Sequence, residues 1–383
     1  MPAIYLDNAA STRVSDEVLA LVTEVMRTAW GNPSSHHPQG AAARGHLETA
    51  RTRLLAALGD TGDSAGAGEI VWTSGCSEAN ALAVLGAART HEGAIAISTL
   101  EHPAITTLAD ALASEGREVR KVAPGRDGVL DPDEVARAAT GAGVVAFLAV
   151  QNELGTVQPI AAIIAAIRAV APAAHIHVDA AQALGKIALD ASCGADSIAI
   201  AGHKLHAPKG VGALWLKKTA RIAPLWVGGG QQHGLRGGTQ DAPSAAALGL
   251  AAERAVAALP KQRTRWLELA AALLATLEQR GVVVRQLVPD HRRAPHILAL
   301  AIPATPAAAL RNVLSSRGVF ISTGSACADA GAKASPALTA IGLPEADGMV
   351  RFSFAHDTTL EDVTAAATIL ADAIASLGPR QRT

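Results

Sequence analysis

The sequence predicts an α/β protein: a large domain with a mostly parallel sheet flanked by helices, and a smaller α+β domain. Short runs rich in Val and Ile alternate with Ala-rich helical stretches through the middle of the chain, an alternation typical of a parallel sheet. The runs are apolar at almost every position, as expected for strands covered by helices on both faces. From about Ala242 the pattern changes.

The candidate strands of the large sheet are short β-branched runs that are separated by helical stretches such as residues 81–89 and 160–170. Their length and their β-branched residues favour strands over buried helices. In chain order they are residues 69–73, 94–99, 117–122, 144–150, 175–180, 197–201 and 212–216.

The second half of the chain predicts a different architecture. Residues 242–279 are rich in Ala, Leu and Arg and are expected to be helical, with a break at Pro260 because proline removes a helix hydrogen bond. Strand-like segments at 282–287, 296–302 and 350–355, together with two more helices, indicate a smaller α+β domain. The predicted division is a large domain over residues 13–259 and a small domain made of residues 1–12 and 260–383.

Composition excludes several classes of protein. The chain has 383 residues, of which 49% are hydrophobic and 17% charged, so it is not intrinsically disordered. Its net charge of −1 gives no basic excess for binding nucleic acid or an anionic membrane. Its 3 cysteines are too few for a disulfide framework or a paired zinc site, which favours a reducing compartment.

The apolar segments predict neither export nor insertion into a membrane. The first residues lack the basic region and apolar run of a signal peptide. Stretches such as residues 144–150 are far shorter than the ~20 residues that a membrane-spanning helix needs. A cytoplasmic location is therefore expected.

Lys204 is a candidate nucleophile. It follows the apolar run 197–201, stands beside His203 and precedes a Gly/Pro turn. An amine in a partly desolvated site is nucleophilic near neutral pH and forms Schiff bases with carbonyl compounds. The alternative is an ordinary solvated lysine after a strand, which is the commoner case for any single lysine.

Residues 73–80, TSGCSEAN, are a candidate phosphate site. They follow a predicted strand and begin a helix, and the free N–H groups and the dipole at a helix start favour an anion. Gly75 permits a tight turn, and Ser77 can cap the helix. The alternative is an ordinary Ser-capped helix without a ligand.

Three more polar residues stand at or just after the carboxyl ends of predicted strands: Asp179 lies at the end of its strand, and His102 and Asn152 follow theirs. Open α/β sheets bind ligands beyond the carboxyl ends of their strands. Asp179 can hold a protonated ring nitrogen there, and His102 can stack on a planar cofactor or shuttle protons. The alternatives are helix capping for His102 and Asp179, and a turn role for Asn152 before Gly155.

Cys327 is a candidate reactive thiol. It lies in residues 323–336, which are rich in Gly, Ala and Ser, have no strong period and are expected to form a flexible loop. Structural cysteines are usually buried, so a cysteine in such a loop is better explained as reactive, with an incidental thiol as the alternative. Cys193 is expected to be structural, and Cys76 to contribute its backbone N–H rather than its sulfur.

Together these residues resemble cysteine desulfurases of the class V family of pyridoxal-phosphate-dependent aminotransferases. The long segment after Cys327 resembles the NifS/IscS-like group. The resemblance implies the type I fold of pyridoxal-phosphate-dependent transferases. It rests on segments between Tyr5 and Thr359 that match in order and spacing: YLDNAAST, GNPSSHHPQG, TSGCSEAN, EHPA, QNELGTVQPI, HVDAAQALGK, GHKLHAPKGVGAL, GGGQQHGLRGGT, GSAC and VRFSFAHDTT.

The resemblance implies that pyridoxal 5'-phosphate is the cofactor. Lys204 would carry it as a Schiff base and act in catalysis, and Asp179 would pair with the ring nitrogen. Gln182 would bond the ring hydroxyl oxygen, and His102 would stack on the ring and take part in catalysis. The residues implied to hold the phosphate are Cys76, Ser77 and His203, with Thr239 reaching the phosphate of a partner subunit.

The resemblance also implies the substrate and the reaction. Arg351 would bind the carboxylate of L-cysteine, since a guanidinium donates two parallel hydrogen bonds. Asn152 would contact both the substrate and the cofactor. The Cys327 thiolate would attack the substrate sulfur, leaving a persulfide on Cys327 and L-alanine as product.

The implied partners follow from this reaction. A sulfur-acceptor protein, in iron–sulfur cluster assembly or in a thiolation pathway, would take the sulfur from Cys327. The role of Thr239 implies a homodimer, and no membrane or nucleic-acid partner is expected.

One departure from the family pattern bears on the cofactor: Ala201 stands where these enzymes usually have a serine that binds the phosphate. Two alternative functions share most of the site. A pyridoxal-phosphate-dependent selenocysteine or C–S lyase does not need Cys327. A non-catalytic scaffold with the same fold is disfavoured, because Lys204, Asp179 and Cys327 are all present.

Overall fold

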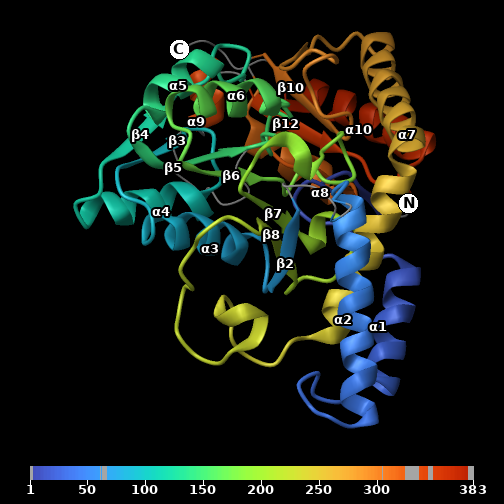
Figure 1. The fold of residues 1–383 in the computed structure, drawn as a ribbon. Helices are drawn as coiled ribbons and strands as arrows, with labels where there is room; N and C mark the ends of the chain where they lie inside the picture. Colours follow the sequence, from blue (N-terminus) through green and yellow to red (C-terminus); the bar gives the residue numbers. More distant parts are fainter. Residues whose placement is uncertain are drawn as a thin grey trace.

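A seven-stranded sheet forms the centre of the computed structural model (Figure 1), which describes residues 3–60, 62, 67–303, 305–323, 336–343 and 348–377. The strand order is β2-β8-β7-β6-β5-β3-β4. Only β8 runs antiparallel to its neighbours; the other pairs are parallel, which confirms the mostly parallel sheet. The strands are β2 (Gly68–Thr73), β3 (Ala94–Ser98), β4 (Val119–Val122), β5 (Ala142–Leu148), β6 (His175–Asp179), β7 (Ser197–Ala201) and β8 (Gly212–Lys217).

Helices cover both faces of this sheet, as Figure 1 shows. Helices α3 and α4 pack on one face, and α2, α5, α6 and the first half of α7 pack on the other. The helices that cover the sheet or pack beside it are α1 (Asp16–Thr28), α2 (Pro38–Ala57), α3 (Cys76–Ala88), α4 (Pro103–Ser114), α5 (Pro132–Ala139), α6 (Ile160–Val170) and α7 (Ala242–Gln279), with short 3₁₀ turns at η1 (Ala191–Cys193), η2 (Gly202–Lys204) and η3 (Gln231–Gly234).

Strand β6 shows how the sheet separates polar from apolar side chains. Successive strand residues point to opposite faces, and Ile176 and Val178 enter the core beneath α5, α6 and α7. His175, His177 and Asp179 therefore point to the face that α3 covers. All five residues of β6 are buried, so these three polar side chains need partners within the protein.

A second hydrophobic core brings the two ends of the chain together. Ile4 and Leu6 pack with residues from Trp266 onward, up to Ala373. A small antiparallel sheet, in the order β12-β10-β9, and the parallel pair β1-β11 frame this core. Its elements are β1 (Ile4–Tyr5), β9 (Arg285–Gln286), β10 (Ile297–Ile302), α8 (Ala307–Ser316), β11 (Val319–Phe320), α9 (Pro336–Ala340), β12 (Gly348–Ser353) and α10 (Leu360–Leu377).

Two local predictions were wrong. Helix α7 continues through Pro260 without a break, because α2 and α1 pack on its first half and α10 on its second. Residues 282–287 contain only the two-residue strand β9, since β9 lies at the edge of its sheet and Val283 is 77% exposed. The division of the chain into domains at residue 260 stays a prediction.

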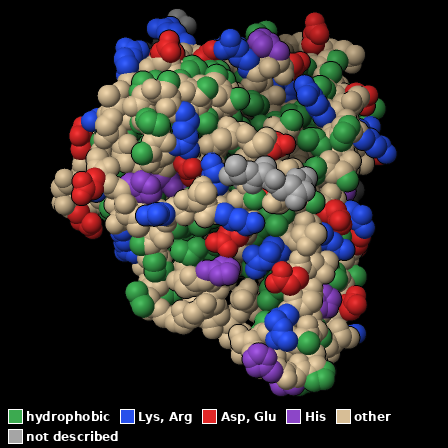
Figure 2. Space-filling view, in the orientation of Figure 1, with side chains coloured by type: hydrophobic (Ala, Val, Ile, Leu, Met, Phe, Trp, Pro, Cys, Tyr) green, Lys and Arg blue, Asp and Glu red, His purple; other side chains and the backbone are tan. Residues whose placement is uncertain are grey.

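The surface carries charges of both signs. Figure 2 shows basic and acidic side chains interspersed over the visible face. Within the described ranges, no helix is both long and apolar enough to cross a lipid bilayer.

Candidate active site

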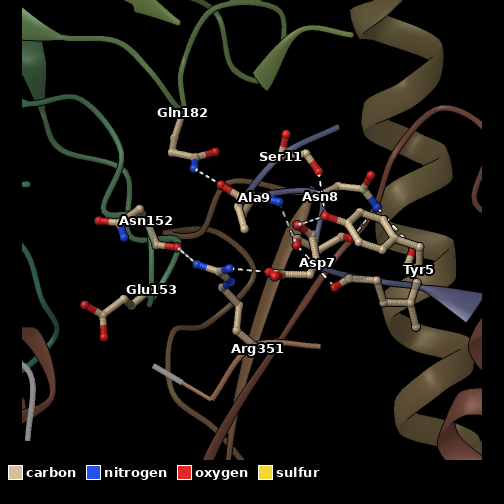
Figure 3. A network of polar contacts seen from close by, with 12 residues as sticks. Tyr5, Asp7, Asn8, Ala9, Ser11, Asn152, Glu153, Gln182 and Arg351 are labelled. Atoms are coloured by element: carbon tan, nitrogen blue, oxygen red, sulfur yellow. Dashed lines mark hydrogen bonds and ion pairs between the residues drawn. The ribbon is translucent and has the colours of Figure 1, made fainter. Parts of the chain in front are cut away.

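A short N-terminal segment, residues 7–10, crosses from the second core to the end of the large sheet (Figure 3). It is anchored on β12, where the backbone N of Ala9 donates to Ser353 Oγ at 2.8 Å and Asn8 Nδ2 donates to the Ser353 carbonyl at 2.9 Å. Its backbone carbonyls thereby become fixed acceptors at the carboxyl ends of β6 and β7.

Lys204 meets this segment directly. It ends the turn η2, one step after β7. Its Nζ donates to the carbonyl oxygens of Ala9 and of Ala10, the second at 2.7 Å. Burial and the nearby Arg351 lower the pKa of Lys204 to about 8. This amine can therefore lose its proton near neutral pH.

Asp179 lies at the end of β6, beneath the start of α3. Its Oδ1 accepts from the backbone N of Ala181 at 2.9 Å and from Cys76 Sγ at 3.6 Å, and its Oδ2 accepts from Asn80 Nδ2 at 2.7 Å. Burial and this carboxylate raise the pKa of the Cys76 thiol well above its usual value. Cys76 is therefore a neutral donor here rather than a thiolate nucleophile.

His102 and Gln182 flank this region. His102 caps α4, where its Nδ1 accepts from the backbone N of Ala104 at 3.1 Å, and burial lowers its pKa. Gln182 donates from Nε2 to the Ala9 carbonyl at 2.7 Å, and its Oε1 lies 3.3 Å from Nε2 of the buried His296. The capping bond expected as the alternative for His102 is thus present, whereas the described residues after Asp179 form turns, so the helix-capping alternative for Asp179 was wrong.

Arg351 is a buried cation between two parts of the site, as Figure 3 shows. Its two terminal nitrogens donate to Asp7 Oδ1 at 2.5 Å and to the backbone carbonyl of Asn152 at 2.6 Å. Its Nε is buried and has no hydrogen-bond partner among the described residues. Asn152 therefore meets Arg351 through its backbone.

The start of α3 has an open N-terminus. Its N-cap is Gly75, which provides no side-chain cap, and a Cβ at Gly75 would meet nothing within 4 Å. Gly212 in β8 lies so close that a Cβ there would come within 2.5 Å of the Gly75 backbone. The Ser77 capping expectation was wrong, because Glu78 binds the Ser74 N–H at 2.6 Å and the helix begins at Cys76.

The remaining predicted residues lie farther from these contacts or outside the described ranges. His203 Nδ1 lies 3.4 Å from Ser11 Oγ, and burial lowers the pKa of His203 to about 4. Thr239 is exposed and lines a surface cavity of about 310 Å³ with Trp30 and other residues. Cys193 is half-buried, and Cys327 lies outside the described residues.

Three parts of the site were missed by the sequence analysis. Asp7 and the carbonyls of Ala9 and Ala10 lie in the segment YLDNAAST, which was noted as a motif without a role for any residue. Asn80 closes the segment TSGCSEAN, and its bond to Asp179 spans 99 residues of sequence. The sequence did offer a signal for Asp7 and Asn80, because both are polar residues within segments whose other residues are typical of turns and helix caps.

Known proteins share this architecture. The family model described as "Aminotransferase class-V" matches residues 4–365. The cysteine desulfurase NifS of Azotobacter vinelandii is 36% identical over 373 residues, which cover 95% of this chain and 90% of NifS.

Two solved structures extend the comparison. One titled "NIFS-LIKE PROTEIN" aligns with a TM-score of 0.89 and 30% identity, covering 98% of this chain and 100% of that one. One titled "SspA in complex with cysteine" aligns with a TM-score of 0.77 and 29% identity, covering 91% of this chain and 98% of that one.

Proposed function

The chain belongs to the class-V aminotransferase family, and from that premise we propose that it is a cysteine desulfurase that uses pyridoxal phosphate to remove sulfur from L-cysteine. The observation that carries the proposal is the half-buried Lys204 amine, which among the described residues donates its hydrogen bonds to backbone carbonyls and has a lowered pKa. Relatives named cysteine desulfurase match almost the whole chain, and one structural neighbour was solved with cysteine.

The residues present fit pyridoxal phosphate. The uncapped start of α3 at Gly75 offers N–H groups to a phosphate. Lys204 offers an amine that can be neutral, and Asp179 offers a carboxylate to a ring nitrogen at the end of β6. When bound, the cofactor supplies an electron sink that stabilises negative charge on the substrate's α-carbon.

Lys204 would hold the cofactor and move the substrate's protons. Its Nζ would accept the α-proton of cysteine in the neutral form, which its lowered pKa favours. Asp179 holds the ring by a charge-assisted hydrogen bond. Gln182 bonds the ring hydroxyl, while His102 stacks on the ring and keeps water from that face. Cys76, Ser77 and His203 hold the phosphate.

Arg351 would bind the substrate carboxylate together with Asn152. The buried Nε of Arg351, which has no partner among the described residues, supports this role, because an unsatisfied buried donor is costly and a carboxylate would satisfy it. Asp7 holds the guanidinium in place from its other side. Asn152 also contacts the cofactor edge.

Cys327 would accept the sulfur. Its thiolate attacks the substrate sulfur, so that an S–S bond forms and the bond between the substrate's β-carbon and sulfur breaks. The electron pair of the broken bond stays with the β-carbon, which takes up a proton, and L-alanine leaves. The persulfide on Cys327 then passes its outer sulfur to a cytoplasmic acceptor protein in cluster assembly or thiolation.

A homodimer would complete the site. Large apolar side chains are exposed near Thr239: Met26 and Trp30, which line its cavity, are 60% and 70% exposed. A second copy of this chain would cover them and would place Thr239 at the partner's phosphate. Light scattering at assay concentration tests this, with Trp30→Glu expected to yield monomers that bind the cofactor less tightly.

The decisive experiment compares Cys327→Ala with the matched control Cys193→Ala. Wild type and Cys193→Ala should release alanine and, with a reductant, sulfide from L-cysteine, and a persulfide should be found on Cys327 by mass spectrometry. Cys327→Ala should keep the visible absorbance of the bound cofactor and lose sulfide release. Wild-type desulfuration by Cys327→Ala would favour the lyase instead, and a wild-type protein without visible absorbance would favour the scaffold.

A further inference from the structure

A row of buried polar side chains continues inward from Asp179 beneath α3. Asn80, His177, Ser197 and His175 are each at most 2% exposed. Burying polar groups is unfavourable unless they are hydrogen-bonded. Within the part of the chain that the structure describes, none of these four side chains has a buried polar atom without a hydrogen-bond partner. Nothing in the desulfurase reaction itself requires them.

The contacts form one unbranched chain. Asn80 Nδ2 lies 2.7 Å from Asp179 Oδ2, and Asn80 Oδ1 lies 2.9 Å from His177 Nε2. Ser197 Oγ lies 2.8 Å from His177 Nδ1 and 2.8 Å from His175 Nε2. The strand register supports this geometry, because His177 pairs with Ser197 across β6 and β7.

Hydrogen-bond chemistry gives the chain a direction. The Asp179 carboxylate can only accept, so the Asn80 amide nitrogen donates to it and the Asn80 oxygen accepts from His177. His177 then carries its proton on Nε2 and accepts on Nδ1. The Ser197 hydroxyl donates its proton to His177 Nδ1, so the Ser197 oxygen is left to accept from His175 Nε2–H.

Both rings are held in the neutral form that this direction requires. Burial lowers the pKa of His177 to about 3, and burial lowers that of His175 to about 4. A neutral imidazole has one donor and one acceptor nitrogen. Each ring therefore has a single tautomer that satisfies the chain.

We propose that Asn80, His177, Ser197 and His175 are positioning residues, whose one-way hydrogen-bond chain fixes Asp179 as an acceptor for the cofactor's ring nitrogen. Every donor in the chain points toward Asp179, and aligned hydrogen bonds polarise one another. The chain thereby stabilises negative charge on Asp179 from the buried side. The role assigned to Asp179 rests on the proposed function, whereas the direction of the chain does not.

Tautomers read by NMR test the direction. The full chain, labelled with [15N]histidine, is measured at neutral pH with and without pyridoxal phosphate, and signals are assigned by their loss in His177→Gln and His175→Gln. Both rings should carry their proton on Nε2 and none on Nδ1. A proton on Nδ1 of His177, or a charged ring, would overturn the chain and leave the desulfurase proposal intact.

Cofactor binding tests the consequence for Asp179. His177→Gln keeps a donor that can reach Asn80, whereas His177→Leu has none. His177→Leu should therefore weaken pyridoxal phosphate binding about tenfold, and His177→Gln should weaken it much less. Ser197→Ala, a smaller change, should weaken binding in the same direction. His91→Gln is the control, because the His91 ring lies 5.9 Å from His175 without joining the chain. Wild-type binding in both His177→Leu and Ser197→Ala would refute the positioning role.

Discussion

Lys204 and Arg351 bind the same short segment, residues 7–10, but with different partners. Among the described residues, the Lys204 ammonium donates hydrogen bonds to the neutral carbonyls of Ala9 and Ala10, whereas the Arg351 guanidinium donates to the carboxylate of Asp7. Carbonyl dipoles offset the burial of a charge less well than an opposite charge does. Burial and the nearby charge of Arg351 accordingly lower the pKa of Lys204 to about 8, while a guanidinium keeps its charge.

The difference separates two tasks within one pocket. A cation with neutral partners can give up its proton and so can act as a base or a nucleophile. A cation paired with a carboxylate remains charged and binds an anion. The same backbone segment thus supports catalysis at one point and substrate binding at another.

Removing the amine should have the largest effect. Lys204→Ala should lose the visible absorbance of the lysine-bound cofactor and reduce turnover by ~10²–10⁴-fold, since Lys204 is the group proposed to move the α-proton. Absorbance spectra and alanine release measure the two losses. Lys209→Ala, an exposed lysine of the same loop, is the control and should behave as wild type. Unchanged turnover in Lys204→Ala would show that the Lys204 amine does not act in catalysis and would contradict the comparison with Arg351.

Removing the permanent charge should affect substrate binding instead. Arg351→Gln should raise KM for L-cysteine by roughly tenfold to a hundredfold, because a charge-assisted hydrogen bond contributes ~1.5–3 kcal/mol. The visible absorbance should remain, since the cofactor is held elsewhere. Steady-state kinetics give KM and kcat, with the exposed Arg285→Gln as control. If Arg351→Gln instead lost the bound cofactor and lowered kcat as strongly as it raised KM, Arg351 would not be a residue that only binds the substrate.

The phosphate end of the pocket should respond more weakly. Ala201 is buried and pairs with Gly212, which in turn lies against Gly75 at the start of α3. Ala201→Ser should therefore tighten pyridoxal phosphate binding by roughly tenfold, through one added hydrogen bond to the phosphate. Titration of cofactor-free protein measures this, and unfolding temperatures of both forms check the strand. Equal or weaker binding would mean that residue 201 does not face the phosphate.

The smallest effect should be a shift in pH dependence. Burial and Arg351 lower the pKa of Lys204, while Asp7 raises it. Asp7→Asn should lower that pKa further, so the neutral amine would form at lower pH. In cofactor-free protein, reductive methylation of Lys204 should rise with pH around 8 in wild type and at lower pH in the variant. Asp110→Asn, which removes only the exposed partner of Lys121, should leave the profile unchanged.

The pattern of the sequence was sufficient for the large sheet but not for every element. Runs such as residues 197–201 became strands with the predicted bounds, because a buried strand is apolar along its whole length. Pro260 and residues 282–287 were predicted wrongly, since packing against α10 and an edge position decided their structure. Tertiary contacts can override the secondary structure that local residue propensities favour.

The candidate site divides in the same way. Lys204, Asp179 and His102 could be found from sequence because each stands at or just beyond the carboxyl end of a strand of an α/β sheet, where ligands bind. The partners that set their chemistry could not, because hydrogen bonds such as Lys204 to Ala10 join residues 194 positions apart. No periodicity or spacing reports such a contact.

By itself, then, the sequence determined the α/β class, the residue types at the strand ends and the resemblance to a family of enzymes. The tertiary structure alone decided that Lys204 is half-buried against carbonyls, that Arg351 is paired with Asp7, and that two histidines of β6 lie in a chain to Asp179. The physical reason is that identity and periodicity are local properties. Burial, charge pairing and tautomer depend on which distant segments the folded core brings together.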